Sequence, residues 1–208
     1  MSSDAPLDGP LPAGEFGAWL CEVQAAIRGE GATDVACGTC VACCSSSQFI
    51  HIAPDEIDAL AHIPKALVFP APRAPRGHVL MGYNEHGRCP MLRETGCSIY
   101  EHRPRTCRTY DCRVFPAAGV LPEGHDKAAI AATAGRWVFT YTTDEQLALH
   151  DAVRAAAAFM RSRTAELGED APHTTTQLAV AAVDVHALFN DATPTVDAVR
   201  VQLRHRSR

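Results

Sequence analysis

Apolar residues recur at helical spacing near the start of the chain, where one stripe predicts a helix over residues 15–28, with Gly29 as its stop. The members of the stripe follow positions i, i+3, i+4, i+7 and i+11: Phe16, Trp19, Leu20, Val23 and Ile27. Cys21 lies off this stripe, and we expect a small buried or half-buried side chain there rather than a metal ligand. Residues 1–14 show no such pattern and predict a flexible tail.

The last part of the chain predicts one strand followed by Ala-rich helices. Residues 136–142 are rich in β-branched and aromatic side chains, which favour a strand. The segment 142–146 has the pattern of a capping box that opens a long helix, and Gly168 is its expected end. Thr174 and Gln177 repeat this pattern for a second helix, and a third is predicted from near Pro194.

Between these regions the pattern predicts short strands and irregular connections. Residues 48–52, 78–83 and 88–92 read as strands, although Pro90 restricts the last of them to an edge or a loop. A helix is predicted to begin at Pro54, where acidic residues fill the first turn.

Composition and charge limit the classes of partner and compartment. The formal net charge of −5 disfavours a nucleic-acid partner. No stretch approaches the roughly 18 apolar residues of a membrane span, and residues 1–14 lack the basic start and apolar run of a signal peptide. We therefore expect a cytoplasmic protein without a membrane partner, in which clustered thiols indicate metal or redox chemistry rather than disulfides.

The cysteines fall into two groups. The first has the spacing CxxCxxCC over residues 37–44, and a CxxC turn brings two sulfurs to one side of the chain, where both can bind one metal. Cys44 requires a second metal position or a structural role, because adjacent side chains diverge in a regular backbone. The second group is spread over residues 89–112, among six arginines that are expected to offset thiolate charge as a group: Arg88, Arg93, Arg103, Arg105, Arg108 and Arg113.

Together these motifs resemble the YkgJ-type cysteine-cluster family, whose members are described as zinc- or iron-chelating domains and whose distant relatives include a flagellin lysine methylase. The resemblance covers residues 35–115 and rests on the CxxCxxCC run, on the Cys-Pro-Met-Leu segment at 89–92 and on the segment CSIYEHRPRTCR at 97–108. It implies metal-binding roles for these residues: Cys37, Cys40, Cys43, Cys44, Cys89, Cys97 and Cys107. Cys112 joins them on spacing alone.

The ligand pattern favours an iron–sulfur cluster of the 4Fe-4S type over zinc. Thiols suit both, but two zinc sites typically use paired CxxC knuckles, and the second group has none. A CxxCxxC run with a remote Cys-Pro is closer to a ferredoxin cluster, although ferredoxins place that Cys-Pro nearer in sequence. One arrangement uses Cys37, Cys40 and Cys43 with one remote thiol on the cluster, and the remaining cysteines form a second site or line the first.

Other polar residues are expected to support the site rather than form it. With eight thiols present, the five histidines of this region are predicted to be surface or supporting groups: His51, His62, His78, His86 and His102. Tyr100 and Tyr110 are predicted to be packing aromatics. Catalytic residues stay unknown, because no nucleotide loop, Ser/His/Asp arrangement or paired carboxylate site stands out.

These observations predict a small α+β protein with an irregular cysteine-rich metal-binding core, short strands and peripheral helices. The predicted organisation is a flexible tail (1–14), a helix plus cysteine-cluster domain (15–116), and a strand and helical part packing on it (117–208). In one function, the cluster is redox-active or supports modification of a protein partner. In the alternative, zinc stabilises an interaction module that has no catalytic activity.

Overall fold

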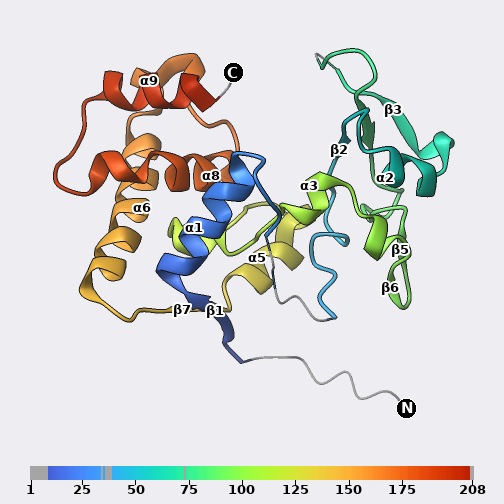
Figure 1. Cartoon of the computed structure of the whole chain (residues 1–208), viewed down its shortest axis with the longest axis horizontal. Coiled ribbons are helices and arrows are strands. Elements are labelled where there is room, and N and C mark those ends of the chain that lie inside the picture. Colours follow the sequence, from blue (N-terminus) through green and yellow to red (C-terminus); the bar gives the residue numbers. More distant parts are fainter. Residues whose placement is uncertain (1–8, 34, 36–38, 73, 207–208) are drawn as a thin grey trace. The chain divides into compact units, whose positions relative to one another are not determined.

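The computed structural model describes residues 9–33, 35, 39–72 and 74–206, and its helices and short strands confirm the α+β class (Figure 1). The chain divides into two compact units, each made of several segments. We call residues 1–21, 113–121 and 132–208 the helical unit, and residues 22–112 and 122–131 the cysteine unit. The division predicted from the sequence follows simpler boundaries and stays a prediction. Among the described residues, no helix combines the length and apolar character needed to cross a membrane.

The helical unit combines a two-stranded sheet with several helices. Its elements are β1 (Leu11–Glu15), α1 (Phe16–Ile27), α4 (Val114–Ala117), α5 (Ala128–Ala134), β7 (Trp137–Thr140), α6 (Asp144–Ser162), α7 (Thr164–Leu167), η4 (Gly168–Asp170), α8 (Thr175–Val185), η5 (His186–Phe189) and α9 (Val196–Arg206). The end of α1 and the start of α5 belong to the cysteine unit. The predicted helix over 15–28 is confirmed as α1.

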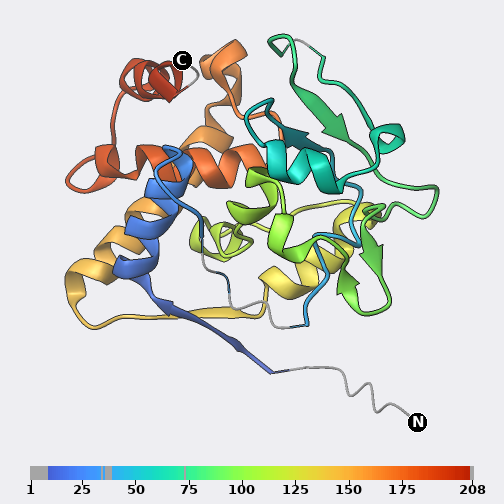
Figure 2. The ribbon, with the colours of Figure 1, turned by 45° about the vertical axis from the view of Figure 1, so that its right-hand side comes forward.

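Strand β1 was not predicted from the sequence. It pairs in parallel with β7, Leu11 opposite Trp137 and Glu15 opposite Thr140, and the two strands run side by side in both ribbon views (Figure 2). The sequence predicts a tail over residues 11–14, where Pro12 and Gly14 are poor strand residues. The pairing forms a strand there despite that local composition, with a register shift between Pro12 and Gly14.

The helix caps of this unit follow the predicted pattern. Thr143 Oγ1 accepts a hydrogen bond from the Gln146 amide (3.4 Å) at the start of α6. At α8 the capping box is complete, since Thr174 Oγ1 accepts from the Gln177 amide (3.1 Å) and Gln177 Oε1 accepts from the Thr174 amide (3.2 Å). Helix α6 ends at Ser162, earlier than predicted, and Gly168 instead follows the short α7.

An aromatic cluster fills the core between α1, β7 and α6. The Phe16 ring is fully buried, meets Phe139 edge-on at 5.1 Å and stacks on His150 at 4.3 Å between ring centroids. The Tyr141 hydroxyl and His150 Nδ1 form a hydrogen bond of 2.5 Å. Burial, followed by the positive charge of Arg154, lowers the pKa of His150 to about 4.

This buried histidine predicts acid sensitivity of the helical unit. The pKa of His150 lies below the value of about 6.5 expected in the unfolded chain, so at intermediate pH the unfolded state binds more protons than the folded state. We expect stability to be full above about pH 6.5 and to fall as the pH drops toward 4. His150→Phe keeps an aromatic ring against Phe16 but removes the titrating group.

Thermal unfolding of both proteins between pH 7 and 4.5 measures this effect. The wild-type Tm should fall further than that of His150→Phe, by on the order of 4 °C. Acid loss of metal affects both proteins equally and cancels in the difference. Parallel Tm curves would show that His150 does not titrate on unfolding in this range.

The cysteine unit has short elements around a small core. Its elements are β2 (Ile50–Ile52), α2 (Ile57–His62), η1 (Lys65–Leu67), β3 (Val68–Pro70), β4 (Val79–Met81), β5 (Leu92–Arg93), β6 (Gly96–Cys97), η2 (Tyr100–His102), α3 (Arg105–Arg108) and η3 (His125–Lys127). Strand β4 lies between β2 and β3 and pairs antiparallel with both. The sheet packs into a core of five buried residues: Ile52, Ile63, Met81, Met91 and Ile99.

The strand predicted over residues 88–92 is replaced by a small hairpin. β5 and β6 pair Leu92 with Cys97 and Arg93 with Gly96, and Gly96 has φ +112°, a value that glycine adopts without steric cost. Cys89 and Pro90 lie before the hairpin in a turn. Pro90 has no amide proton to donate to a strand ladder, which explains why pairing starts only after it.

Candidate metal centre

The first cysteine segment folds into a tight turn. The Ser45 amide donates to the Val41 carbonyl (2.9 Å), and Ser46 Oγ donates to the Ala42 carbonyl (2.9 Å). The side chains of Cys43 and Cys44 are hydrogen-bonded to each other within this turn. Adjacent side chains diverge in a regular backbone, but in this turn the side chains of Cys43 and Cys44 contact each other.

Cys89 joins the second cysteine segment directly to the first. Its amide donates to the Cys44 carbonyl (2.8 Å), and its side chain is hydrogen-bonded to that of Cys44. The Cys89 carbonyl in turn accepts from the Leu92 amide (3.0 Å), which closes the turn before the hairpin. Cys44 thus lies between Cys43 and Cys89 and contacts both side chains.

Helix α3 carries Cys107 and is held in place by the buried Glu56. The Glu56 carboxylate accepts from the Ala53 amide (2.8 Å) before α2 and from the Arg105 amide at the first position of α3. Thr106 Oγ1 adds a bond to the His51 carbonyl in β2 (2.6 Å). The sequence did not predict this role of Glu56, because Arg105 lies 49 residues away.

Seven of the predicted cysteines line one cavity of the cysteine unit, about 1170 Å³ in volume: Cys40, Cys43, Cys44, Cys89, Cys97, Cys107 and Cys112. Cys89 and Cys97 also pack against the small core, and Cys112 is buried. Cys37 lies outside the described residues. Every described cysteine is a free thiol. Cys21 is exposed, so its predicted burial is wrong, and it is not among the residues that line the cavity.

The thiols of this cavity share their protons unequally. Hydrogen bonds from Cys44 lower the pKa of Cys43 to about 7 and that of Cys89 to about 6, and the same bonds raise the pKa of Cys44 itself. Burial, followed by the negative charges of neighbouring thiolates, raises the pKa of Cys107 to about 12. Neighbouring thiolates therefore repel each other, and a bound cation relieves this repulsion.

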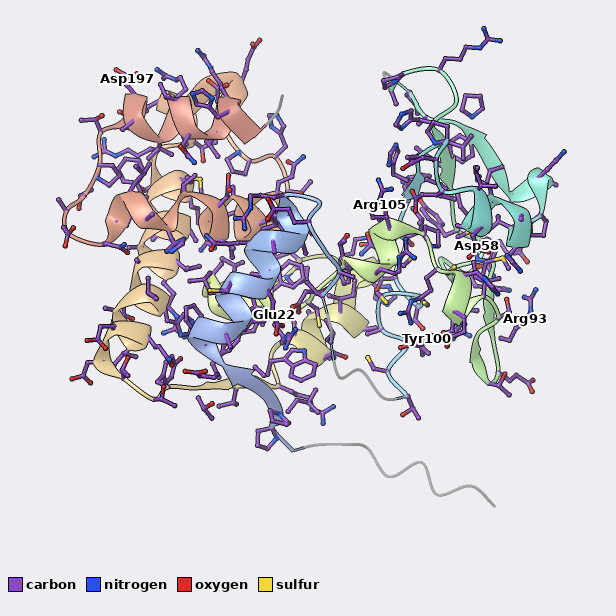
Figure 3. All side chains as sticks on the ribbon, viewed as in Figure 1. Glu22, Asp58, Arg93, Tyr100, Arg105 and Asp197 are labelled. Carbon is purple, nitrogen blue, oxygen red and sulfur yellow. The ribbon has the colours of Figure 1, made fainter. Side chains whose placement is uncertain are left out.

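Four of the six arginines line the same cavity: Arg88, Arg93, Arg103 and Arg108. The Arg103 guanidinium lies over the exposed Tyr100 ring, 3.5 Å from its centroid. The other two arginines have separate partners, since Arg105 pairs with Asp55 at 2.7 Å and the buried Arg113 donates to the Ala13 carbonyl at 3.0 Å. Figure 3 shows Arg93, Tyr100 and Arg105 in this unit.

Two buried polar atoms at this cavity lack hydrogen-bond partners among the described residues. They are Arg103 Nε and the Tyr110 hydroxyl, and both side chains line the cavity. Buried donors are seldom left unpaired, because each costs roughly 1–3 kcal/mol. A thiol-rich donor set with two free donors beside it fits a bound metal or metal–sulfur group, whose sulfurs accept hydrogen bonds.

A thiol-lined cavity with these features defines a metal-chelating domain. Residues 36–132, just under half of the chain, match the family model described as "CxxCxxCC: Putative zinc- or iron-chelating domain". The match confirms the resemblance to a zinc- or iron-chelating cysteine-cluster domain that the cysteine motifs predict. The same match supports chelation of zinc or iron by this domain. No curated protein and no solved structure matches the chain.

Proposed function

We propose that the cavity of the cysteine unit holds an iron–sulfur cluster, of the 4Fe-4S type, and that the protein is redox-active. The observation that carries this proposal is the gathering of seven free thiols from two distant segments on one cavity. A single tetrahedral zinc ion uses four ligands, so this number of thiols exceeds what one ion needs. A cluster, or a cluster with a second site, uses more of them.

The surroundings of the cavity support a redox role. Hydrogen bonds to cluster sulfurs and the degree of solvent exposure set the reduction potential of iron–sulfur centres. Arg103 and Tyr110 supply donors, and Cys40 and Cys43 lie at the exposed side of the site. A cytoplasmic protein partner would reach the cluster from this side, either to exchange electrons or to be modified. The cluster itself would supply one-electron chemistry.

We also propose which remote cysteine completes the ligand set that the sequence suggested. Cys89 is hydrogen-bonded to Cys44 of the CxxCxxCC segment through its amide and its side chain, so we take it as the fourth ligand beside Cys37, Cys40 and Cys43. Cys44 then contacts two ligands and is placed either to bridge them to a second metal or to support the first site. Cys97, Cys107 and Cys112 complete the lining.

Anaerobic purification with elemental analysis tests the proposal. We expect a brown protein with broad visible absorption and about four iron and four sulfide per chain, or up to twice that if a second cluster forms. If the protein is colourless and holds stoichiometric zinc, the proposed redox function is wrong and the zinc-stabilised interaction module is the function that remains. The packing of Cys89 and Cys97 against the small core is the observation that favours this second function.

A further inference from the structure

A second group of potential metal ligands lies outside the cysteine cavity. Asp58 and His62 are four residues apart on α2, and His102 is on η2; Figure 3 labels Asp58. One candidate ligand atom from each side chain lies within 4.8 Å of the others. None of the three residues is among those that line the cavity.

The two imidazole rings converge on the Asp58 carboxylate. His102 Nδ1 is 2.9 Å from Asp58 Oδ2, and His62 Nδ1 is 3.6 Å from Asp58 Oδ1. The rings are stacked with centroids 3.5 Å apart and planes 4° from parallel. A carboxylate oxygen of Asp58 therefore lies beside a ring nitrogen of each histidine.

Once the two rings turn out of their stacked arrangement, so that a nitrogen of each points at one ion, these separations fit a divalent transition metal. With zinc–nitrogen and zinc–oxygen bonds of about 2.0–2.2 Å, neighbouring ligands of a tetrahedral ion lie about 3.3 Å apart. The observed 2.9 and 3.6 Å lie on either side of that value. Two imidazoles and one carboxylate also form a donor set that zinc uses when one position is left for water, and all three side chains are partly exposed to solvent.

We propose that Asp58, His62 and His102 form a second metal site, for Zn²⁺ or a similar divalent transition ion bound through nitrogen and oxygen. Without metal, His62 Nδ1 faces the Asp58 carbonyl at 2.8 Å and His102 Nδ1 faces the carboxylate, so both carry their protons there. When the ion binds, the Nδ1 proton of each ring is lost to solvent and Nε2 of the same ring takes up a proton. The ion then binds the freed Nδ1 atoms. All three side chains are open to solvent over more than a third of their surface, so exchangeable rather than permanent binding is expected.

The position of the site gives it a structural consequence. His102 lies between Cys97 and Cys107 in the chain, and Asp58 follows Glu56, which holds the first turn of α3. An ion bound here would link α2 to the segment that presents the second cysteine group. The proposal does not depend on which metal the thiols hold, because the two sites share no ligand.

Metal titration of the full-length protein without a polyhistidine tag tests the site. The protein is purified with its thiol-bound metal in place, and Co²⁺ is added while the visible spectrum is recorded. We expect one further Co²⁺ per chain with weak visible bands and without the intense sulfur-to-cobalt absorption of a thiolate site. His62→Gln and His102→Gln should each weaken this binding by at least tenfold. His173→Gln, which changes an exposed histidine of the helical unit, should leave it unchanged.

Two results would overturn the proposal. One is equal Co²⁺ uptake by wild-type protein and by the His62→Gln/His102→Gln double variant. The other is uptake that always shows thiolate absorption, which would place the ion at the cysteines and leave the proposed function intact. If the double variant does not fold, imidazole NMR resonances of the wild-type protein decide, since those of His62 and His102 should shift with Zn²⁺ and that of His173 should not.

Discussion

Cys89→Ser protein is expected to lose most of its bound metal. Cys89 connects the two cysteine segments through its amide and its side chain, and hydrogen bonding to Cys44 lowers the pKa of its thiol to about 6. A serine hydroxyl stays protonated and is a harder, poorer ligand for zinc or iron–sulfur clusters. Mutation of a residue that only hydrogen-bonds a metal ligand typically costs about 10–100-fold in metal affinity. Loss of a ligand itself should therefore weaken binding by more than about 100-fold.

Metal per chain, measured after anaerobic purification and desalting, gives the result. Cys21→Ser is the matched control, because it makes the same substitution at an exposed thiol outside the cavity lining and should retain full metal. Circular dichroism shows whether the variant keeps its helices. Full metal content in folded Cys89→Ser protein would remove Cys89 from the ligand set.

The cysteine cavity could be predicted from the sequence because thiol spacing is a local and unusual signal. CxxCxxCC and the dispersed cysteines of residues 89–112 indicated two segments that meet, and the structure places seven of them on one cavity. The pairing of sulfurs could not be predicted in the same way. The contact between Cys43 and Cys44 depends on the turn geometry after Val41, and that of Cys44 with Cys89 depends on a long-range backbone hydrogen bond.

The elements that hold the site show the same division between local and distant signals. The caps at Thr143 and Thr174 were predicted because each is complete within a few residues. Glu56 resembled an ordinary acidic residue in the first turn of a helix, and only the folded chain shows that its buried carboxylate also holds the amide of Arg105. Strand β1 was missed for the same reason, since its partner β7 begins only at Trp137.

The same contrast between local and long-range structure indicates how each unit depends on metal. The cysteine unit has short elements and one small buried cluster, which includes Ile52, Met81 and Ile99. The helical unit has the 19-residue α6 with an extended buried face, including Val153 and Met160. Apolar burial is the main source of folding free energy, so we expect the cysteine unit to rely on bound metal and the helical unit to rely on its own core.

Removal of the metal by a chelator under reducing conditions is therefore expected to unfold the cysteine unit selectively. Structural zinc contributes roughly 10–16 kcal/mol of apparent binding free energy in small domains, which equals or exceeds the usual stability of a domain, about 5–15 kcal/mol. Hydrogen–deuterium exchange followed by mass spectrometry of the full chain measures this separately for each unit. Amides of residues 39–52 and 89–108 should lose nearly all protection, while those of α6 and α8 keep theirs.

Restoring the metal provides the control for this experiment. Protection of residues 39–52 and 89–108 should return after anaerobic reconstitution with the native metal, because unpaired thiols are still free to bind it. Cys21→Ser protein should lose and regain protection as the wild type does. If residues 89–108 stay protected without metal, the hydrogen bonds of Glu56 and the core around Met91 hold the unit by themselves, and the metal would then serve chemistry rather than folding. If protection is lost in both units together, the chain folds as one cooperative body, and its stability as a whole would depend on the thiol-bound metal.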